Sequence, residues 1–272
     1  MTTNADLLAV YEARLRGEAE MGNTVRRQRI GPVHAGEFDS RGTGFVSYSS
    51  LDGLGGEVLD DLIASVVAYF RQGTNVTEFE WKTRGHDAPD DLPERLLAHG
   101  FVADELETVM LGSASTVADG ISGEGLSSAD HVVIREVGTG SASREADLAA
   151  ALALQEEVFG HPAGSLDDAL RNLDAQPETM SFWVADAGGR VVSAGRLSVV
   201  EGTDVAGIWG GVTHPEWCGH GIYRALTAAR ARWGIERGVR YLHSDSTEFS
   251  RPILERSGLQ AVTTTTPYIW TL

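Results

Sequence analysis

Cysteine is almost absent from this chain of 272 residues, which contains only Cys218. A disulfide within the chain is therefore impossible, and a metal site built from cysteine thiolates is not expected. The sequence also lacks any apolar run near the ~20 residues that a membrane-spanning helix needs. Its first residues have neither the basic start nor the apolar core of a secretory signal. We therefore expect a cytoplasmic protein with no membrane partner and no metal.

Basic residues are scarce, since 22 Lys and Arg stand against 39 Asp and Glu, for a net charge of -17. This charge repels phosphate backbones, so we expect no nucleic-acid partner. It favours cationic ligands such as amines, although acidic surfaces more commonly serve solubility. Hydrophobic residues make up 42% of the chain, which is enough to build a buried core.

The first half of the chain has the patterns of a layered α/β domain. Apolar residues at helical spacing predict helices over residues 6–21, 59–70 and 90–99. Alternating residues predict strands over residues 24–34, 43–49, 76–82 and 106–111. The small and polar residues that follow are typical of a flexible connector. We therefore place a first domain at 1–112, a linker at 113–130 and a second domain at 131–272.

The second domain alternates strands and helices in the order of a mixed α/β fold. Its predicted strands cover residues 132–136, 181–186, 190–200, 205–213, 241–245 and 268–272. Its predicted helices cover residues 143–159, 166–173, 221–237 and 250–256.

A faint internal repeat links the two domains. Residues 93–101, Pro-Glu-Arg-Leu-Leu-Ala-His-Gly-Phe, are echoed by residues 252–259, Pro-Ile-Leu-Glu-Arg-Ser-Gly-Leu. In both places a strand with an aromatic residue precedes the short helix, and a strand that contains threonine follows it. Two related folds in tandem would produce this pattern.

A glycine-bearing loop lies between the predicted strand 205–213 and the predicted helix 221–237. It contains Gly219-His220-Gly221 immediately before the helix. The first N–H groups of a helix are unpaired and carry partial positive charge, and glycines there allow phosphate oxygens to approach. The segment can thus hold a pyrophosphate, although a Gly-x-Gly turn by itself is more often a tight connection.

The residues around this loop resemble the acetyl-CoA signature of the GNAT superfamily of N-acetyltransferases. That signature is Val-x-Pro-x-(aromatic)-Arg-Gly-x-Gly-(Ile/Leu), and residues 213–222 are Thr-His-Pro-Glu-Trp-Cys-Gly-His-Gly-Ile. The chain is also similar to tandem GNAT proteins, whose Trp-Lys-x-x-Gly-His-Asp-x-Pro and Thr-Pro-Tyr-x-Trp motifs match residues 81–89 and 266–270. The resemblance implies two tandem GNAT-like domains, each a central mixed sheet flanked by helices. The first would be a degenerate copy that does not bind CoA.

The resemblance implies acetyl-CoA as the co-substrate and assigns residues to it. Gly211, Val212 and Thr213 would end the strand whose backbone pairs with the pantetheine amides. Ser250 matches a small polar position near the pantetheine. The pyrophosphate loop would consist of Gly219, His220, Gly221, Ile222, Tyr223 and Arg224.

The sequence departs from the family pattern at three positions. One is His220, which stands between the two glycines where the family often has a basic residue. Cys218 stands where the family usually has Arg or Gln, which removes a positive charge from the loop. Leu254 stands where the family frequently has the tyrosine that protonates the leaving thiolate, so no general acid can be assigned there.

The proton acceptor for an amine is predicted to be Asp245, because it ends the strand 241–245 where the cleft should open. The alternative is that Asp245 caps a helix or is a solvated loop acid.

The leading hypothesis is an acetyl-CoA-dependent N-acetyltransferase that transfers the acetyl group directly to a small amine. The alternative is a non-catalytic acyl-CoA-binding or regulatory protein of the same fold. Leu254 and the lack of a carboxylate on strand 205–213 favour the alternative. GNAT enzymes often dimerise, so a homodimer is a further expectation.

Overall fold

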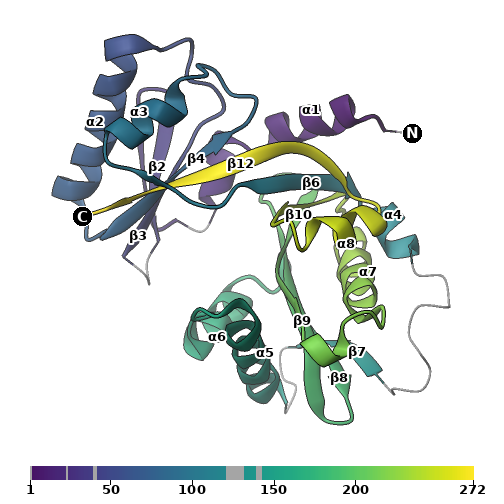
Figure 1. Cartoon of the computed structure of the whole chain (residues 1–272). Coiled ribbons are helices and arrows are strands. Elements are labelled where there is room, and N and C mark those ends of the chain that lie inside the picture. The colour runs from purple at the N-terminus through teal and green to yellow at the C-terminus, as the bar shows by residue number, and fades with distance from the viewer. Residues whose placement is uncertain (1, 23, 39–41, 121–131, 139–142) are drawn as a thin grey trace. The chain divides into compact units, whose positions relative to one another are not determined.

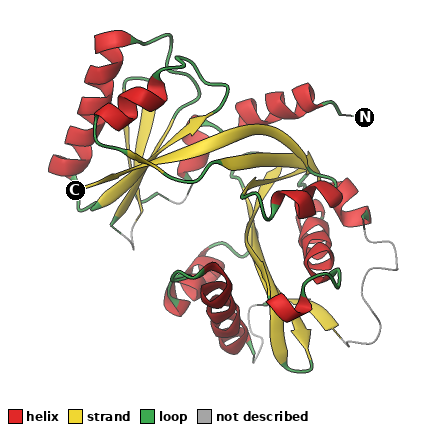
Figure 2. Cartoon of the chain, viewed as in Figure 1, coloured by secondary structure: helices red, strands yellow, loops and turns green. Residues whose placement is uncertain are grey.

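The computed structural model describes residues 2–22, 24–38, 42–120, 132–138 and 143–272 (Figure 1). It divides into two compact units. Unit 1 comprises Met1–Met110, Asp245–Arg251 and Ala261–Leu272, and unit 2 comprises Leu111–Ser244 and Pro252–Gln260. Both contain strands and helices, so the predicted mixed α/β class is confirmed (Figure 2). No helix within the described ranges is long and apolar enough to cross a membrane.

The sheet of unit 1 has the strand order β1-β2-β3-β4-β12-β6, with the short β5 also pairing with β12. Strands β3 and β4 are parallel and are connected by α2. The hydrophobic core contains Phe70, Phe79 and Trp81, and the rings of Phe70 and Phe79 stack at 4.2 Å. The elements of this unit are α1 (Asn4–Arg14), η1 (Gly17–Met21), β1 (Arg26–Ile30), β2 (Val33–Phe38), β3 (Thr43–Ser47), α2 (Gly56–Gly73), β4 (Glu78–Arg84), α3 (Leu92–Ala98), β5 (Val102–Ala103), most of β12 (Gln260–Thr271) and the start of β6 (Glu107–Ser113).

The sheet of unit 2 has the strand order β11-β10-β9-β8-β7. Strands β10 and β11 are parallel, and the other neighbours are antiparallel. Helices α5 and α6 lie on one side of these strands and α7 lies on the other (Figure 1). The elements are α4 (Ala114–Asp119), β7 (Val132–Glu136), α5 (Arg144–Phe159), α6 (Leu166–Ala175), β8 (Met180–Ala187), β9 (Arg190–Val199), β10 (Val205–Thr213), η2 (Pro215–Trp217), α7 (Ile222–Ile235), β11 (Tyr241–Ser246) and α8 (Arg251–Arg256).

The internal repeat is visible in the backbone. The motifs β3–α2–β4 and β10–α7–β11 each consist of two parallel strands joined by a helix. The short helices α3 and α8 also end alike, because the Phe101 N–H donates to the Leu96 carbonyl at 3.1 Å and the Leu259 N–H donates to the Leu254 carbonyl at 3.0 Å. The two halves therefore share their local hydrogen bonding as well as their order of elements.

The prediction of a flexible linker over residues 113–130 is wrong for its first residues, because residues 114–119 form α4. Ser113 caps this helix by accepting from the Thr116 N–H, and Ala114, Val117 and Ala118 are buried. Small residues suggested flexibility in the sequence, but small side chains also allow a helix to pack closely, and α4 packs against α7. The remaining residues 121–130 of the predicted linker lie outside the described part of the chain.

The C-terminal strand differs in length and in its neighbours from the prediction. It begins at Gln260 rather than at residue 268, and it pairs with β4 of unit 1, where Tyr268 lies opposite Trp81. The compact units therefore do not follow the continuous ranges 1–112 and 131–272. The threonine-rich run 263–266 has high strand propensity. Its partner strand, β4, comes from the other half of the sequence.

Two predicted elements at the N-terminus are each divided in the structure. The helix expected over 6–21 breaks at Gly17, whose φ is +62° and where a Cβ would lie only 2.6 Å from the Ser49 hydroxyl. The strand expected over 24–34 becomes β1 and β2, which turn at Gly31 with φ +56°.

Candidate cofactor site

The predicted strand, glycine loop and helix are confirmed as β10, the loop that contains η2, and α7. Two of its residues are core positions, since Val212 is 2% exposed and Ile222 is 1% exposed. One continuous segment of unit 2 carries Gly211, Val212, Thr213, Gly219, His220, Gly221, Ile222, Tyr223 and Arg224.

The N-terminus of α7 has the properties of an anion site. Its N-cap, Gly221, has φ +77° and makes no side-chain capping bond, and no acidic residue stands in the first turn. Gly219 has φ +84°, and a Cβ added there would meet nothing within 4 Å. The backbone N–H groups are thus not masked by side chains, and the helix dipole favours negative charge at this place. The segment fits a pyrophosphate.

The side chains around this helix start serve mainly to hold the loop. Arg224 donates from Nη2 to the Gly120 carbonyl at 2.8 Å, so its charge is directed to the end of α4. The His220 ring lies 6.2 Å from the Trp217 ring. The hydroxyls of Thr213 and Ser193 are 2.9 Å apart. An anion bound at this place would therefore meet backbone N–H groups rather than these side chains.

Strand β10 presents a free edge toward β11. The two strands pair at Val205↔Tyr241, Ala206↔Leu242 and Gly207↔His243, and within the described residues no pair follows. Beyond Gly207, no described strand pairs with this edge of β10, so its backbone groups other than the Gly210 carbonyl can meet a ligand that carries amides. An extended chain can bind such an edge as an added strand would.

A β-bulge interrupts β10 within this free edge. The register against β9 shifts between Trp209 and Val212, and Gly210 has φ +58°. From α5, Gln155 donates from Nε2 to the Gly210 carbonyl at 2.6 Å. From α7, the Tyr223 ring covers Gly211, where a Cβ would lie 2.5 Å from the hydroxyl oxygen. The bulge is therefore held by helices on both faces of the sheet.

Sequence analysis missed both Gln155 and Arg230. Gln155 is 8% exposed and lies on the buried stripe of α5 with Leu148 and Ala151, so a polar residue at an apolar position was the available signal. Arg230 is 0% exposed and lies inside α7. Its spacing of four and eight residues from Leu226 and Ile222 places it on the buried stripe of α7, so the signal was again a polar residue at an apolar position, although an arginine in a helix is ordinarily solvated.

Asp245 and Ser250 belong to unit 1, whereas the glycine loop belongs to unit 2. The Asp245 side chain is 5% exposed and forms an ion pair with Lys82. The Lys82 ammonium also lies 3.8 Å from Glu20 Oε1. Burial alone would lower the pKa of Lys82, but Asp245 and Glu20 outweigh it and raise that pKa above its ordinary value. The Ser250 hydroxyl contacts its own turn, 3.4 Å from the Thr247 carbonyl.

Further acids surround the Lys82–Asp245 pair in unit 1. Glu20 forms an ion pair with Arg84 at 2.5 Å. Burial, supported by Asp245, raises the pKa of Glu107 to about 7. Burial also raises the pKa of Glu80. Glu80 and Glu107 therefore resist ionisation, because burial removes water from their carboxyl groups and neighbouring acids add negative charge.

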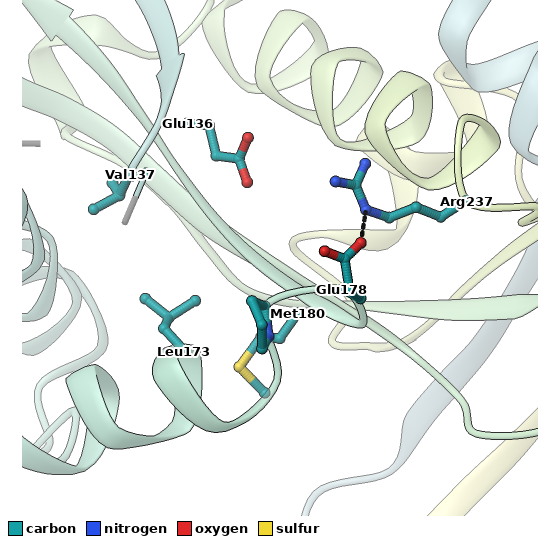
Figure 3. A pocket seen from close by; sticks show the side chains of 8 residues that line it. Glu136, Val137, Leu173, Glu178, Met180 and Arg237 are labelled. Carbon is teal, nitrogen blue, oxygen red and sulfur yellow. Dashed lines mark ion pairs between the residues drawn. The ribbon is translucent and has the colours of Figure 1, made fainter. Parts of the chain in front are cut away.

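A separate pocket of about 290 Å³ lies in unit 2 (Figure 3). Arg237 crosses it toward Glu178, with Nε 3.8 Å from Oε2. The strand registers place it at the end of the sheet where β10 begins, whereas the glycine loop follows the other end. Its lining residues are Glu136, Val137, Gly138, Leu173, Pro177, Glu178, Met180 and Arg237, none of which was predicted as a site residue. Within the described ranges, no group of three or more His, Cys, Asp or Glu side chains could hold a metal ion.

Residues 148–258 match the model of the acetyltransferase (GNAT) family, and no curated protein sequence matches the chain. Among solved structures, a GCN5-related N-acetyltransferase from Kribbella flavida is similar with a TM-score of 0.64 and 13% identity, over 96% of this chain and 94% of that one. A conserved protein of unknown function from Staphylococcus epidermidis has a TM-score of 0.65 at 13% identity, over 92% and 94% of the two chains. A tandem GNAT protein from the clavulanic acid biosynthesis pathway has a TM-score of 0.61 at 15% identity, over 88% and 78%. At these identities the structures show a shared fold. The matched residues 148–258 contain β10, the glycine loop and α7, so the segment that carries the candidate cofactor site is the one that matches the GNAT acetyltransferase family.

Proposed function

We propose that the protein is an N-acetyltransferase that uses acetyl-CoA and transfers the acetyl group directly to a small amine. The observation that carries this proposal is the combination of an uncapped α7 N-terminus, open space at Gly219 and a free β10 edge in one segment. The N-terminus suits a pyrophosphate and the edge suits an amide-bearing chain. CoA contains both groups in that order.

In this proposal the backbone of the chain binds the cofactor. The N–H groups of Gly219, Gly221 and the first turn of α7 hold the pyrophosphate, and the β10 edge from Gly211 to Thr213 holds the extended arm. Bound acetyl-CoA supplies an activated thioester. The net charge of -17 supports a cationic acceptor, because the field of the protein attracts amines.

Unit 1 is proposed to be a degenerate copy that does not bind CoA. Its helix α2 corresponds to α7 and also begins without a side-chain cap, at Gly55. However, Glu57 stands in the first turn of α2, and Asp60 and Asp61 follow it, whereas the first turn of α7 contains no acid. Carboxylates at that position occupy the positive end of the helix dipole and repel phosphate.

Asp245 has a structural role in this proposal. A carboxylate that accepts a proton from an amine must give up the ion pair with Lys82, which makes it a weak base. The alternative function, a non-catalytic acyl-CoA-binding protein, gains support from the same pair. It also gains support from Leu254, which is 0% exposed and supplies no proton donor.

Calorimetric titration with acetyl-CoA, on the full chain and two matched variants, tests the cofactor site. Gly219→Val and Gly53→Val both force a side chain into a left-handed backbone, at φ +84° and +75°, with nothing within 4 Å of the added Cβ. Both variants therefore carry similar backbone strain. We expect binding to the unmodified chain and to Gly53→Val, and at least tenfold weaker binding to Gly219→Val. Equal binding by both variants would exclude the α7 N-terminus as the cofactor site.

A panel of amines then separates the two functions. The assay follows release of the CoA thiol with acetyl-CoA and each amine at pH 8. Release that depends on one class of amine supports the acetyltransferase. Tight acetyl-CoA binding without amine-dependent release supports the non-catalytic protein.

A further inference from the structure

Arg230 is a buried positive charge that makes no ion pair with any described residue. It lies in the middle of α7 and is 0% exposed. Its Nη1 donates to the Arg196 carbonyl at 3.1 Å and its Nη2 donates to the Thr227 hydroxyl at 3.0 Å, but Nε has no hydrogen-bond partner. Because a buried charge is costly unless it is paired, a guanidinium kept without a carboxylate calls for an explanation.

The space around Arg230 is fitted to the guanidinium. A Cβ on Gly195 of β9 would lie 2.6 Å from Nη1, so only glycine leaves room for this side chain. Burial lowers the pKa of Arg230, and Tyr223 partly opposes this effect. No acidic group contributes. Besides the two hydrogen bonds from Nη1 and Nη2, the side chain that offsets the burial is Tyr223, whose ring centroid lies 5.9 Å from the Arg230 Cζ.

Tyr223 connects this charge to the bulge in β10. Its ring lies over Gly211, and the hydroxyl oxygen is 2.5 Å from the position that a Gly211 Cβ would take. The tyrosine is half-buried, whereas Arg230 is enclosed. A hydroxyl with a cation behind it is a stronger hydrogen-bond donor than an ordinary tyrosine. This donor lies beside Gly211, within the bulge in β10.

We propose that the Tyr223 hydroxyl donates a hydrogen bond to the sulfur of CoA when that sulfur carries negative charge, and that Arg230 is the positioning residue that holds and polarises Tyr223. This inference rests on the proposed function. An extended arm anchored at the start of α7 and following the free edge of β10 passes the bulge, and the group on that arm that becomes anionic is the thiolate. Tyr223 would thus supply the stabilisation that Leu254 cannot supply.

The test compares the affinities of CoA and desulfo-CoA for the full chain by calorimetry at pH 7.5 and pH 9.0. A thiol ionises at ~8.5, and the ordinary titration of histidine near ~6.5 is largely complete below this window. Two histidines lie on or beside these strands: the His243 ring of β11 is 5.1 Å from the Trp209 ring of β10, and His214, directly after β10, has Nε2 3.5 Å from Glu157 Oε1. The ratio of the two affinities cancels the pH effects that act equally on both ligands.

We expect the preference for CoA over desulfo-CoA to grow about fivefold to tenfold between the two pH values, as a charge-assisted hydrogen bond forms. Tyr223→Phe and Arg230→Met should remove this growth and keep the affinity for desulfo-CoA, whereas Arg230→Lys should restore part of it. Tyr69→Phe, in unit 1, and Arg232→Met, on the same helix, are the matched controls and should behave like the unmodified chain.

Two results would overturn the inference, and they differ in what they leave standing. If both ligands bind but the preference does not change with pH, or persists in Tyr223→Phe, the role of Tyr223 is refuted and the proposed function survives. If neither ligand binds to the unmodified chain, the proposed function fails and the inference fails with it. If the Arg230→Met variant does not fold, the pH dependence of the CoA preference in Tyr223→Phe decides the test by itself.

Discussion

Replacement of Asp245 by asparagine separates a structural ion pair from a catalytic base. The Asp245 side chain is 5% exposed and the Lys82 side chain is 12% exposed. Asparagine keeps the shape of the side chain but removes the charge that compensates Lys82. If the carboxylate is structural, Asp245→Asn destabilises unit 1. If it accepts the proton of the amine, the variant keeps its stability and loses turnover.

The expected loss follows from the charge that is left behind. Breaking a buried pair by removing one partner costs ~3–5 kcal/mol. Lys82 keeps a weaker partner in Glu20 at 3.8 Å, and Glu20 is itself paired with Arg84 at 2.5 Å. We therefore expect the lower end of that range, about 3 kcal/mol. For a chain of this size such a loss lowers the unfolding temperature by roughly 6–12 °C.

Calorimetric unfolding at pH 7 of the unmodified chain, Asp245→Asn and the double variant Lys82→Met/Asp245→Asn provides the measurement. The double variant removes the uncompensated charge, so it should regain most of the lost stability. Asp90→Asn, an exposed acid of unit 1, is the matched control and should change the unfolding temperature by less than about 2 °C. An Asp245→Asn variant that unfolds with the unmodified chain but has lost amine-dependent turnover would refute the structural assignment.

Three further predictions follow from packing and charge. Glu107 has a pKa raised to about 7 against ~4.3 when unfolded, so its contribution to stability is present at acid pH and is lost as pH rises through 7. Glu107→Gln should therefore raise the unfolding temperature at pH 8 and leave it nearly unchanged at pH 4.5; equal shifts at both pH values would contradict this. Gly211→Ala places a Cβ 2.5 Å from the Tyr223 hydroxyl, so it should weaken acetyl-CoA binding at least tenfold by calorimetry, and unchanged affinity would mean that Tyr223 moves freely. Residues 131–272 expressed alone lack α4 and leave β12 without its partner β4, so this fragment should aggregate or bind a hydrophobic dye. A soluble fragment that unfolds cooperatively would show that the pairing of β12 with β4 is dispensable.

The sequence by itself determined the local structure of the cofactor segment. A helix N-terminus depends on the residues next to it in the chain, so the glycines at 219 and 221 could be recognised without knowledge of the fold. The strand before them and the amphipathic helix after them were predicted within a few residues of β10 and α7. The repeated helix ends at Gly100 and Gly258 were likewise visible, because they rest on hydrogen bonds within a few residues.

Only the tertiary structure decided which distant residues share a site. The pairing of β12 with β4, the packing of α4 on α7 and the ion pair between Lys82 and Asp245 join residues far apart in the sequence. No local pattern encodes such a partner, since a threonine-rich strand or a strand-end aspartate fits many neighbours equally well. Arg230 shows this most clearly: an arginine is ordinarily solvated, and its burial against Tyr223 and Gly195 arises only when α7 packs on the sheet. Adjacent residues determine the local backbone conformation, whereas burial and charge pairing depend on which surfaces the folded chain brings together.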